Sequence, residues 1–269
     1  MDRATLAARL RQKWTAAFGY RAVIRRLAFR LERYSRRWYD APYAERPEVG
    51  PVNLEVKLAR VRAGGPFEPH EIALLNRAAV TLLQPRHRQV LEVGSGTGMF
   101  ASLAAADPER RITASEYNEP ARAWAAENRS AANITYCARA LGTFDSDAFD
   151  LVVAVEVIEH LEAYGPFVRA LARVAPEALI TTPNKASGAF RSIDRTPDYP
   201  EHVREWTAGE FLWVLRAFYG DVQLFTIPDR DRQVGAMRAA PGYVPHVAAC
   251  SDLSTEEPLL ALCSRPFRD

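Results

Sequence analysis

The feature that most constrains the fold is a short apolar run that leads directly into a glycine-rich loop. Residues 89–93 read Gln-Val-Leu-Glu-Val, and Gly94, Gly96 and Gly98 follow at alternate positions. Glycine takes positive φ angles without strain and lets the backbone approach a ligand closely. A helical pattern begins at about residue 97. The segment therefore predicts a buried strand, a ligand-binding loop and a helix, in that order.

Beyond this segment the sequence alternates between short apolar runs and helical spacing. This alternation predicts a doubly wound α/β fold, in which helices cover both faces of a parallel sheet. We expect helices over residues 97–106, 118–131, 161–174 and 207–218, the last opened by a capping box between Thr207 and Glu210. We expect strands over residues 89–93, 111–116, 134–138, 149–155, 178–182, 222–227 and 258–263.

The first third of the chain has a different, helical pattern. Leu6, Leu10 and Trp14 are spaced by four residues, and a further helical pattern runs between Pro69 and Pro85. We therefore divide the chain into a helical extension, residues 1–84, and a sheet domain, residues 85–269. The extension is expected to act as a lid, a substrate-binding region or a dimer contact.

Composition excludes several classes of function. The net charge is +2, so the whole chain lacks the excess of positive charge typical of a nucleic-acid binder. Three widely spaced cysteines and the lack of an apolar leader favour a reduced, cytoplasmic protein. Residues 1–40 hold 11 basic and 3 acidic side chains. This basic segment leaves three interpretations open: a solvated helix face, a peripheral membrane contact, or RNA binding.

Two acidic residues accompany the glycine loop. Glu92 stands two positions before Gly94, and Glu116 ends the next expected strand, 22 positions after Gly94. An acid at the end of that strand can accept hydrogen bonds from the hydroxyls of a ribose. The glycine spacing is GxGxG, which disfavours the GxGxxG loop of nicotinamide dehydrogenases.

These residues resemble motifs I and II of class I S-adenosylmethionine-dependent methyltransferases. The resemblance covers about residues 85–265 and implies a Rossmann-like, seven-stranded sheet whose last strand is antiparallel. It implies S-adenosylmethionine as the cofactor. Many relatives bind adenine with an acid after the third strand, whereas this chain has Ala140 and Leu141 there. The implied cofactor residues are Glu92, Gly94, Ser95, Gly96, Gly98, Glu116, Tyr117, Leu141 and Glu156.

A third group of polar residues follows the fourth expected strand. If Glu156 begins a helical turn, Glu159 and His160 lie on the same face of it. This arrangement allows two chemistries. His160 can act as a general base toward a substrate hydroxyl, or the three side chains can bind a divalent metal such as Mg²⁺ or Mn²⁺.

The stretch Glu156–Leu161 resembles O-methyltransferases of this superfamily, and His202 lies in a His-Val-Arg-Glu segment that small-molecule and sugar-modifying relatives share. The resemblance implies a small-molecule hydroxyl, on a sugar, glycolipid precursor or natural product, as the acceptor, with Glu159, His160 and His202 as catalytic residues. One alternative is a metal-dependent RNA 2′-O- or quinone O-methyltransferase that uses Glu156, Glu159, His160 and His202. Another is a non-catalytic module that binds the cofactor or a protein partner.

Overall fold

The computed structural model describes residues 54–63, 65–186, 202–240 and 242–267, which all lie in one compact unit spanning residues 43–269. Our predictions for residues 1–53, including their helices and their dimer, membrane or RNA contacts, fall outside the described residues. Within the described ranges, no helix is both long and apolar enough to cross a membrane.

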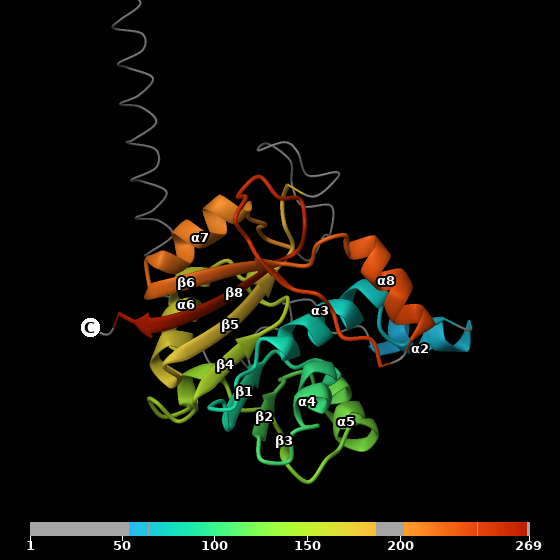
Figure 1. Ribbon diagram of the computed structural model, residues 1–269. Helices are drawn as coiled ribbons and strands as arrows, with labels where there is room; N and C mark the ends of the chain where they lie inside the picture. The colour runs from blue at the N-terminus through green and yellow to red at the C-terminus, as the bar shows by residue number, and fades with distance from the viewer. Residues whose placement is uncertain (1–53, 64, 187–201, 241, 268–269) are drawn as a thin grey trace, which may run out of the picture. The chain divides into compact units, whose positions relative to one another are not determined.

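Strands and helices alternate along the described chain (Figure 1). The strands are β1 Gln89–Val93, β2 Arg111–Ser115, β3 Ile134–Cys137, β4 Leu151–Ala154, β5 Glu177–Thr182, β6 Tyr219–Thr226, β7 Ala248–Ala249 and β8 Leu259–Pro266. The helices are α2 Leu54–Arg62, α3 His70–Thr81, α4 Met99–Ala104, α5 Glu119–Asn128, α6 Tyr164–Val174, α7 Ala208–Arg216 and α8 Arg230–Ala239, with the short 3-10 helices η2 Leu141–Thr143 and η3 Ile158–His160.

The strands form one sheet in the order β3-β2-β1-β4-β5-β8-β6-β7. The first five strands are parallel, and β8 runs antiparallel between β5 and β6. The predicted doubly wound fold with an antiparallel last strand is confirmed. The predicted count of seven strands is wrong, because the two-residue strand β7 pairs with the free edge of β6 and makes the sheet eight-stranded.

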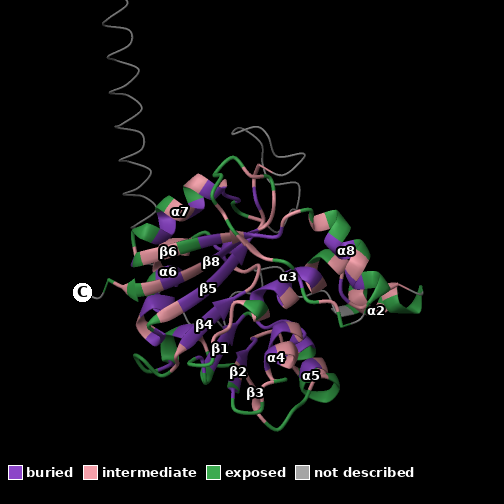
Figure 2. Ribbon diagram, in the orientation of Figure 1, coloured by how far each residue is buried: buried purple, intermediate pink, exposed green. Residues whose placement is uncertain are grey.

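Alternate residues of the central strands point to opposite faces of the sheet, and both faces are covered. On one face, Leu91 and Val152 pack with α6 and α7. On the other, Val90 and Leu151 pack with α3, α4 and α8. Figure 2 shows the result, a mostly buried sheet between helices whose outer sides are exposed. Both faces of the parallel strands are therefore shielded from solvent.

Two of the predicted helix starts, at Asn118 and Thr207, agree with the structure, whereas α4 begins at Met99 and α6 at Tyr164, two and three residues later than predicted. The side chain of Asn118 accepts a hydrogen bond from the Ala121 amide and begins α5. Thr207 and Glu210 bond to each other's backbone amides and form the predicted capping box of α7. Both caps satisfy amides that a helix leaves unbonded in its first turn.

Two helices were not predicted. Val56 and Val61 of α2 are 51% and 45% exposed, so α2 has little apolar periodicity that a sequence pattern could reveal. Helix α8 lies in a long excursion between β6 and β8, and it buries only Gln233, Val234 and Met237. Both helices are held by polar contacts as much as by apolar packing.

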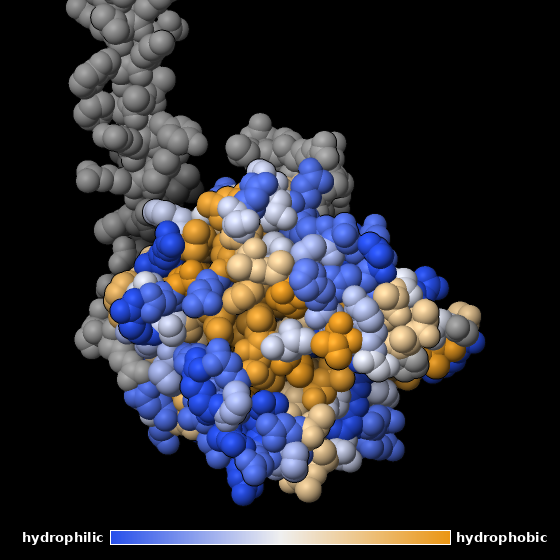
Figure 3. Space-filling model, in the orientation of Figure 1, coloured by the Kyte–Doolittle hydropathy of each residue, from blue (hydrophilic) through white to orange (hydrophobic). Residues whose placement is uncertain are grey.

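Figure 3 shows an apolar area in the middle of the face that looks toward the reader, surrounded by hydrophilic surface. The apolar cluster on the α3 side of the sheet includes residues that are only partly buried, among them Val80, Leu83, Phe225 and Leu262. This side of the sheet therefore keeps some apolar surface in contact with solvent.

Candidate functional site

The glycine loop lies at the carboxyl end of β1 and is bonded to the end of β2. The amides of Gly94 and Ser95 both donate to the carbonyl of Ser115, at 2.9 and 3.1 Å. Gly94, Gly96 and Gly98 all have positive φ angles, between 53° and 74°. The loop therefore needs glycine for its backbone conformation alone, as the sequence predicted.

Two of these glycines also lack space for a side chain. A Cβ atom at Gly94 would lie 2.8 Å from Cγ2 of Val157, and one at Gly98 would lie 2.5 Å from the hydroxyl of Tyr136. The loop is thus packed closely between the segment after β4 and the strand β3.

The two predicted acids lie on either side of this loop. Glu92 is 3% exposed and accepts a hydrogen bond from the Ala101 amide in the first turn of α4. Burial raises its pKa to about 8. Glu116 is 4% exposed, and its two carboxylate oxygens accept from the amides of Gly96 and Asn118, both at 2.8 Å. Burial raises the pKa of Glu116 as well.

The residues predicted near the adenine, Ala140 and Leu141, follow β3. Tyr117 follows Glu116 and is partly exposed, whereas Leu141 is 5% exposed at the start of η2. Arg173 of α6 donates to the carbonyls of Leu141 and Phe144, at 3.3 and 2.7 Å. No sequence pattern indicates this role of Arg173, because an arginine on the polar side of a helix is normally solvated.

Glu156 does not begin a helical turn, and this prediction is wrong. Its φ angle is 53°, in the left-handed region, and β4 ends two residues earlier. The Glu156 amide donates to the Thr181 hydroxyl, and that hydroxyl donates to the Glu156 carboxylate, at 3.0 and 2.9 Å. These two bonds to β5 hold the residue in a conformation that is unfavourable for a non-glycine side chain. Burial raises the pKa of Glu156 to about 7.

Glu159 is the most deeply buried of the candidate catalytic residues. It is inaccessible to solvent, and among the described residues its Oε1 has no hydrogen-bond partner. Burial, together with the nearby Glu156, holds its pKa well above the usual range. Its carbonyl accepts from the amides of Val203 and Arg204, at 2.8 and 3.1 Å, and so fixes the segment that carries His202.

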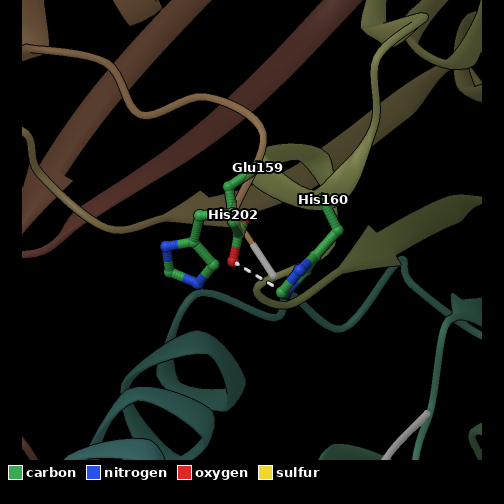
Figure 4. Close-up of side chains that lie close together, drawn as sticks. All are labelled: Glu159, His160 and His202. Atoms are coloured by element: carbon green, nitrogen blue, oxygen red, sulfur yellow. Dashed lines mark ion pairs between the residues drawn. The ribbon is translucent and has the colours of Figure 1, made fainter. Parts of the chain in front are cut away.

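Glu159, His160 and His202 lie together, as the sequence predicted (Figure 4). Nε2 of His160 is 3.8 Å from Oε1 of Glu159. The two imidazole rings meet edge to face, with their centroids 4.9 Å apart. One ligand atom from each of the three side chains lies within 4.8 Å of the others, so the group could bind a metal ion.

The segment after His202 supports this cluster. Nδ1 of His202 is 2.6 Å from Oε1 of Glu205, and Glu205 is 6% exposed. Trp206 forms a parallel bridge with Asn184, whose side-chain amide donates to the carbonyls of Thr255 and Glu257 at 2.7 and 2.9 Å. Sequence analysis singled out neither Thr181 nor these contacts of Asn184, because they depend on segments far apart in the chain.

Comparisons with known proteins agree with this geometry. Residues 91–178 match the methyltransferase domain family. The chain is 34% identical over 131 residues to Rv3030 of Mycobacterium tuberculosis strain H37Rv, named a probable S-adenosylmethionine-dependent methyltransferase. The alignment covers 48% of this chain and 47% of the relative, so the chain spans about half the length of the curated relatives it matches.

Solved structures share the fold at low sequence identity. A structure of a methyltransferase in complex with the Trm112 methyltransferase activator of Haloferax volcanii contains a chain that aligns with this one. The TM-score is 0.56 at 13% identity, over 80% of this chain and 98% of the other. An S-adenosylmethionine-dependent methyltransferase of Thermotoga maritima aligns with a TM-score of 0.53 at 14% identity, over 73% and 90%.

The fold is that of a class I methyltransferase.

Proposed function

We propose that the chain is an S-adenosylmethionine-dependent methyltransferase that methylates an oxygen of a small-molecule hydroxyl. The observation that carries the proposal is the placement of the glycine loop beside Glu116, at the carboxyl ends of β1 and β2. In open α/β sheets, ligands bind at this edge. The methyltransferase domain match and the curated relatives favour the same cofactor.

In this proposal each element at the edge holds one part of the cofactor. The backbone of Gly94 to Gly98 lines the methionine portion, and Ser95 offers a buried hydroxyl that has no partner among the described residues. Glu116 accepts hydrogen bonds from the ribose hydroxyls. Leu141 packs beside the adenine, which lies near Tyr117.

The acceptor side uses the cluster of Glu159, His160 and His202. S-adenosylmethionine supplies an electrophilic methyl group when bound, so a C–O bond forms as the C–S bond breaks. His160 takes the proton that the hydroxyl loses. Glu159, whose Oε1 lies 3.8 Å from Nε2 of His160, positions the imidazole ring beside the acceptor hydroxyl. Most of the rate increase comes from alignment of donor and acceptor.

Cofactor binding can be tested by calorimetric titration of EDTA-treated protein with S-adenosylhomocysteine. We expect Glu116→Ala to weaken binding at least tenfold, because the variant loses the ribose acceptor. Glu119→Ala removes an exposed carboxylate three residues further on and should bind like the wild type. If the wild-type chain does not bind S-adenosylhomocysteine, the proposal is wrong.

The acceptor can be tested with panels of small alcohols, phenols and amines, by following the release of S-adenosylhomocysteine. We expect turnover with hydroxyl compounds, and a loss of about 10²–10⁴-fold in kcat for His160→Ala, the usual contribution of a general base. His246→Ala removes an exposed histidine and serves as the control. Turnover with amines alone, or full activity of His160→Ala, would contradict this proposal.

A second candidate function is metal-assisted methyl transfer to an RNA 2′-hydroxyl or a quinol. It is favoured by the closeness of the three ligand atoms and by the Oε1 atom of Glu159, which lacks a hydrogen-bond partner among the described residues. Carboxylate ligands suit Mn²⁺. Glu159, His160 and His202 would hold the ion, with Glu156 nearby, and the ion would polarise the acceptor hydroxyl.

Calorimetry with Mn²⁺ separates the two candidates without relying on activity. The metal-assisted function requires a Mn²⁺ binding event that Glu159→Ala abolishes and Glu162→Ala, which alters an exposed neighbour, preserves. Full methyl transfer after exhaustive EDTA treatment would exclude it.

A further inference from the structure

The turn between α2 and α3 reaches the glycine loop through a buried carboxylate. Glu68 is 6% exposed, and its Oε1 accepts a hydrogen bond from the Thr97 hydroxyl at 2.5 Å. Thr97 lies between Gly96 and Gly98 and is 2% exposed. A side chain from outside the predicted sheet domain thus contacts the centre of the motif that sequence analysis assigned to cofactor binding.

Two cations complete this contact. Nζ of Lys57, on α2, lies 2.7 Å from Oε2 of Glu68 and 3.4 Å from the Thr97 hydroxyl. Arg129, just after α5, donates to the Thr97 carbonyl at 3.1 Å and lies 3.8 Å from Oε1 of Glu68. Neighbouring elements therefore hold both the hydroxyl and the carbonyl of Thr97.

Aromatic packing anchors the turn to α5. Phe67 stacks on Trp124 with 4.0 Å between ring centroids and 7° between ring planes. The Arg129 guanidinium lies 5.6 Å from the centroid of Phe67 and 5.3 Å from that of Trp124. The stack fixes the residue next to Glu68, so Glu68 has little freedom to leave Thr97.

The glycine loop depends on such external contacts because glycine loses more conformational freedom on ordering than any other residue. On one side, Glu116 accepts from the Gly96 amide. On the other, Thr97 is held by Glu68 and Arg129, and Gly98 abuts Tyr136, whose hydroxyl donates to the Arg129 carbonyl at 3.0 Å. Burying a carboxylate is costly unless it is paired, and Lys57 supplies the pair.

We propose that Glu68 is a positioning residue for the cofactor, which keeps the loop at Gly96–Gly98 in its binding conformation through Thr97. Residues 54–69 therefore belong to the cofactor site although they precede the sheet. The proposal rests on the proposed function, since the loop must bind S-adenosylmethionine for its conformation to matter.

The test measures the dissociation constant of S-adenosylhomocysteine by calorimetry, together with the urea unfolding of the ligand-free protein. We expect Glu68→Gln to weaken binding about tenfold, because the amide keeps the size of the side chain but loses the ion pair with Lys57. Glu71→Gln alters an exposed acid three residues further along and should bind like the wild type.

A double-mutant cycle distinguishes positioning from general stabilisation. Thr97→Val removes the hydroxyl that donates to Glu68. The double variant Glu68→Gln/Thr97→Val should therefore bind little more weakly than either single variant. Thr97→Ser keeps the hydroxyl and should bind within about threefold of the wild type. If Glu68→Gln does not fold, Lys57→Met, which keeps an apolar stem on α2, decides the question together with Thr97→Val.

Each outcome decides one claim. If the wild type binds and Glu68→Gln binds with the same affinity, the role of Glu68 is overturned and the proposed function stands. The same holds if Lys57→Met and Thr97→Val both bind with the affinity of the wild type. Additive effects of Glu68→Gln and Thr97→Val on affinity, with a matching fall in unfolding free energy, also overturn it. Absence of binding by the wild type overturns the proposed function, and the role of Glu68 with it.

Discussion

At the scale of single residues, the candidate site contains four glutamate side chains whose burial disfavours ionisation. Glu92, Glu116, Glu156 and Glu159 all have raised pKa values, and burial is the largest cause for each. A protonated carboxyl can donate a hydrogen bond as well as accept one. Glu156, with a pKa of about 7, can therefore donate as well as accept a hydrogen bond near neutral pH.

Glu92 gives a prediction for the pH dependence of stability. Its pKa is about 8 in the folded chain against a usual value of 4.5. The folded state therefore binds a proton that the unfolded state has released, and stability from this group falls as the pH rises between these two values. In urea unfolding of the ligand-free protein between about pH 5 and pH 7.5, the wild type should lose roughly 1 kcal/mol per pH unit relative to Glu92→Gln.

The comparison with Glu92→Gln isolates this one carboxyl group, because the other buried acids are common to both proteins. The glutamine can still accept the hydrogen bond that the Ala101 amide makes to Glu92. Parallel stability curves for the two proteins would show that Glu92 keeps an ordinary pKa.

At the scale of elements, both the backbone conformation and the close packing of the loop require glycine. Gly98→Ala would place a Cβ atom 2.5 Å from the Tyr136 hydroxyl in a residue with a φ angle of 74°. The left-handed conformation alone costs a non-glycine residue about 1–3 kcal/mol. We expect Gly98→Ala to lower the unfolding free energy by at least that much and to weaken S-adenosylhomocysteine binding, because the loop must shift.

The control for this substitution is Gly142→Ala in η2. A Cβ atom there meets nothing within 4 Å, and the φ angle of Gly142 is not in the left-handed region. Its unfolding free energy in urea should stay the same or rise by up to about 1 kcal/mol, because alanine restricts the unfolded chain. Equal stability losses in the two variants would contradict the specific role of Gly98.

At the scale of the whole molecule, local pattern predicted the sheet well and its periphery poorly. Strand β1 has the predicted ends, and β2 to β5 differ by one or two residues at most at either end. Buried parallel strands are apolar on both faces, so composition reveals them. The family resemblance named Glu159, His160 and His202 together as catalytic residues, and the structure places them together.

What the sequence did not predict depends on polar contacts between distant segments. Glu156 adopts its left-handed conformation against Thr181 of β5, a partner that no local pattern indicates. Glu68 reaches Thr97 across 29 positions of the chain. Such contacts have no periodicity, so they appear only when the fold is known.

The excursion between β6 and β8 is the clearest case, and it gives the last prediction. Gln233 of α8 is 6% exposed. Its amide donates to the carbonyls of Pro228 and His246, and its carbonyl oxygen accepts from the Tyr243 hydroxyl and the His246 amide. One side chain thus closes the segment from residue 228 to residue 246. Gln233→Ala removes all four bonds, and each buried group left unbonded costs about 1–3 kcal/mol.

We expect Gln233→Ala to open this excursion locally while the sheet stays folded, because α8 and β7 lie outside the parallel strands. Trypsin should cleave after Arg230, Arg232 or Arg238 at least tenfold faster than in the wild type, since every 1.4 kcal/mol changes the open population about tenfold. The urea midpoint should change much less. Gln223→Ala, at an exposed position of β6, should be cleaved like the wild type. Equal cleavage of the two variants would mean that apolar packing of α8, and not Gln233, holds the excursion against the rest of the molecule.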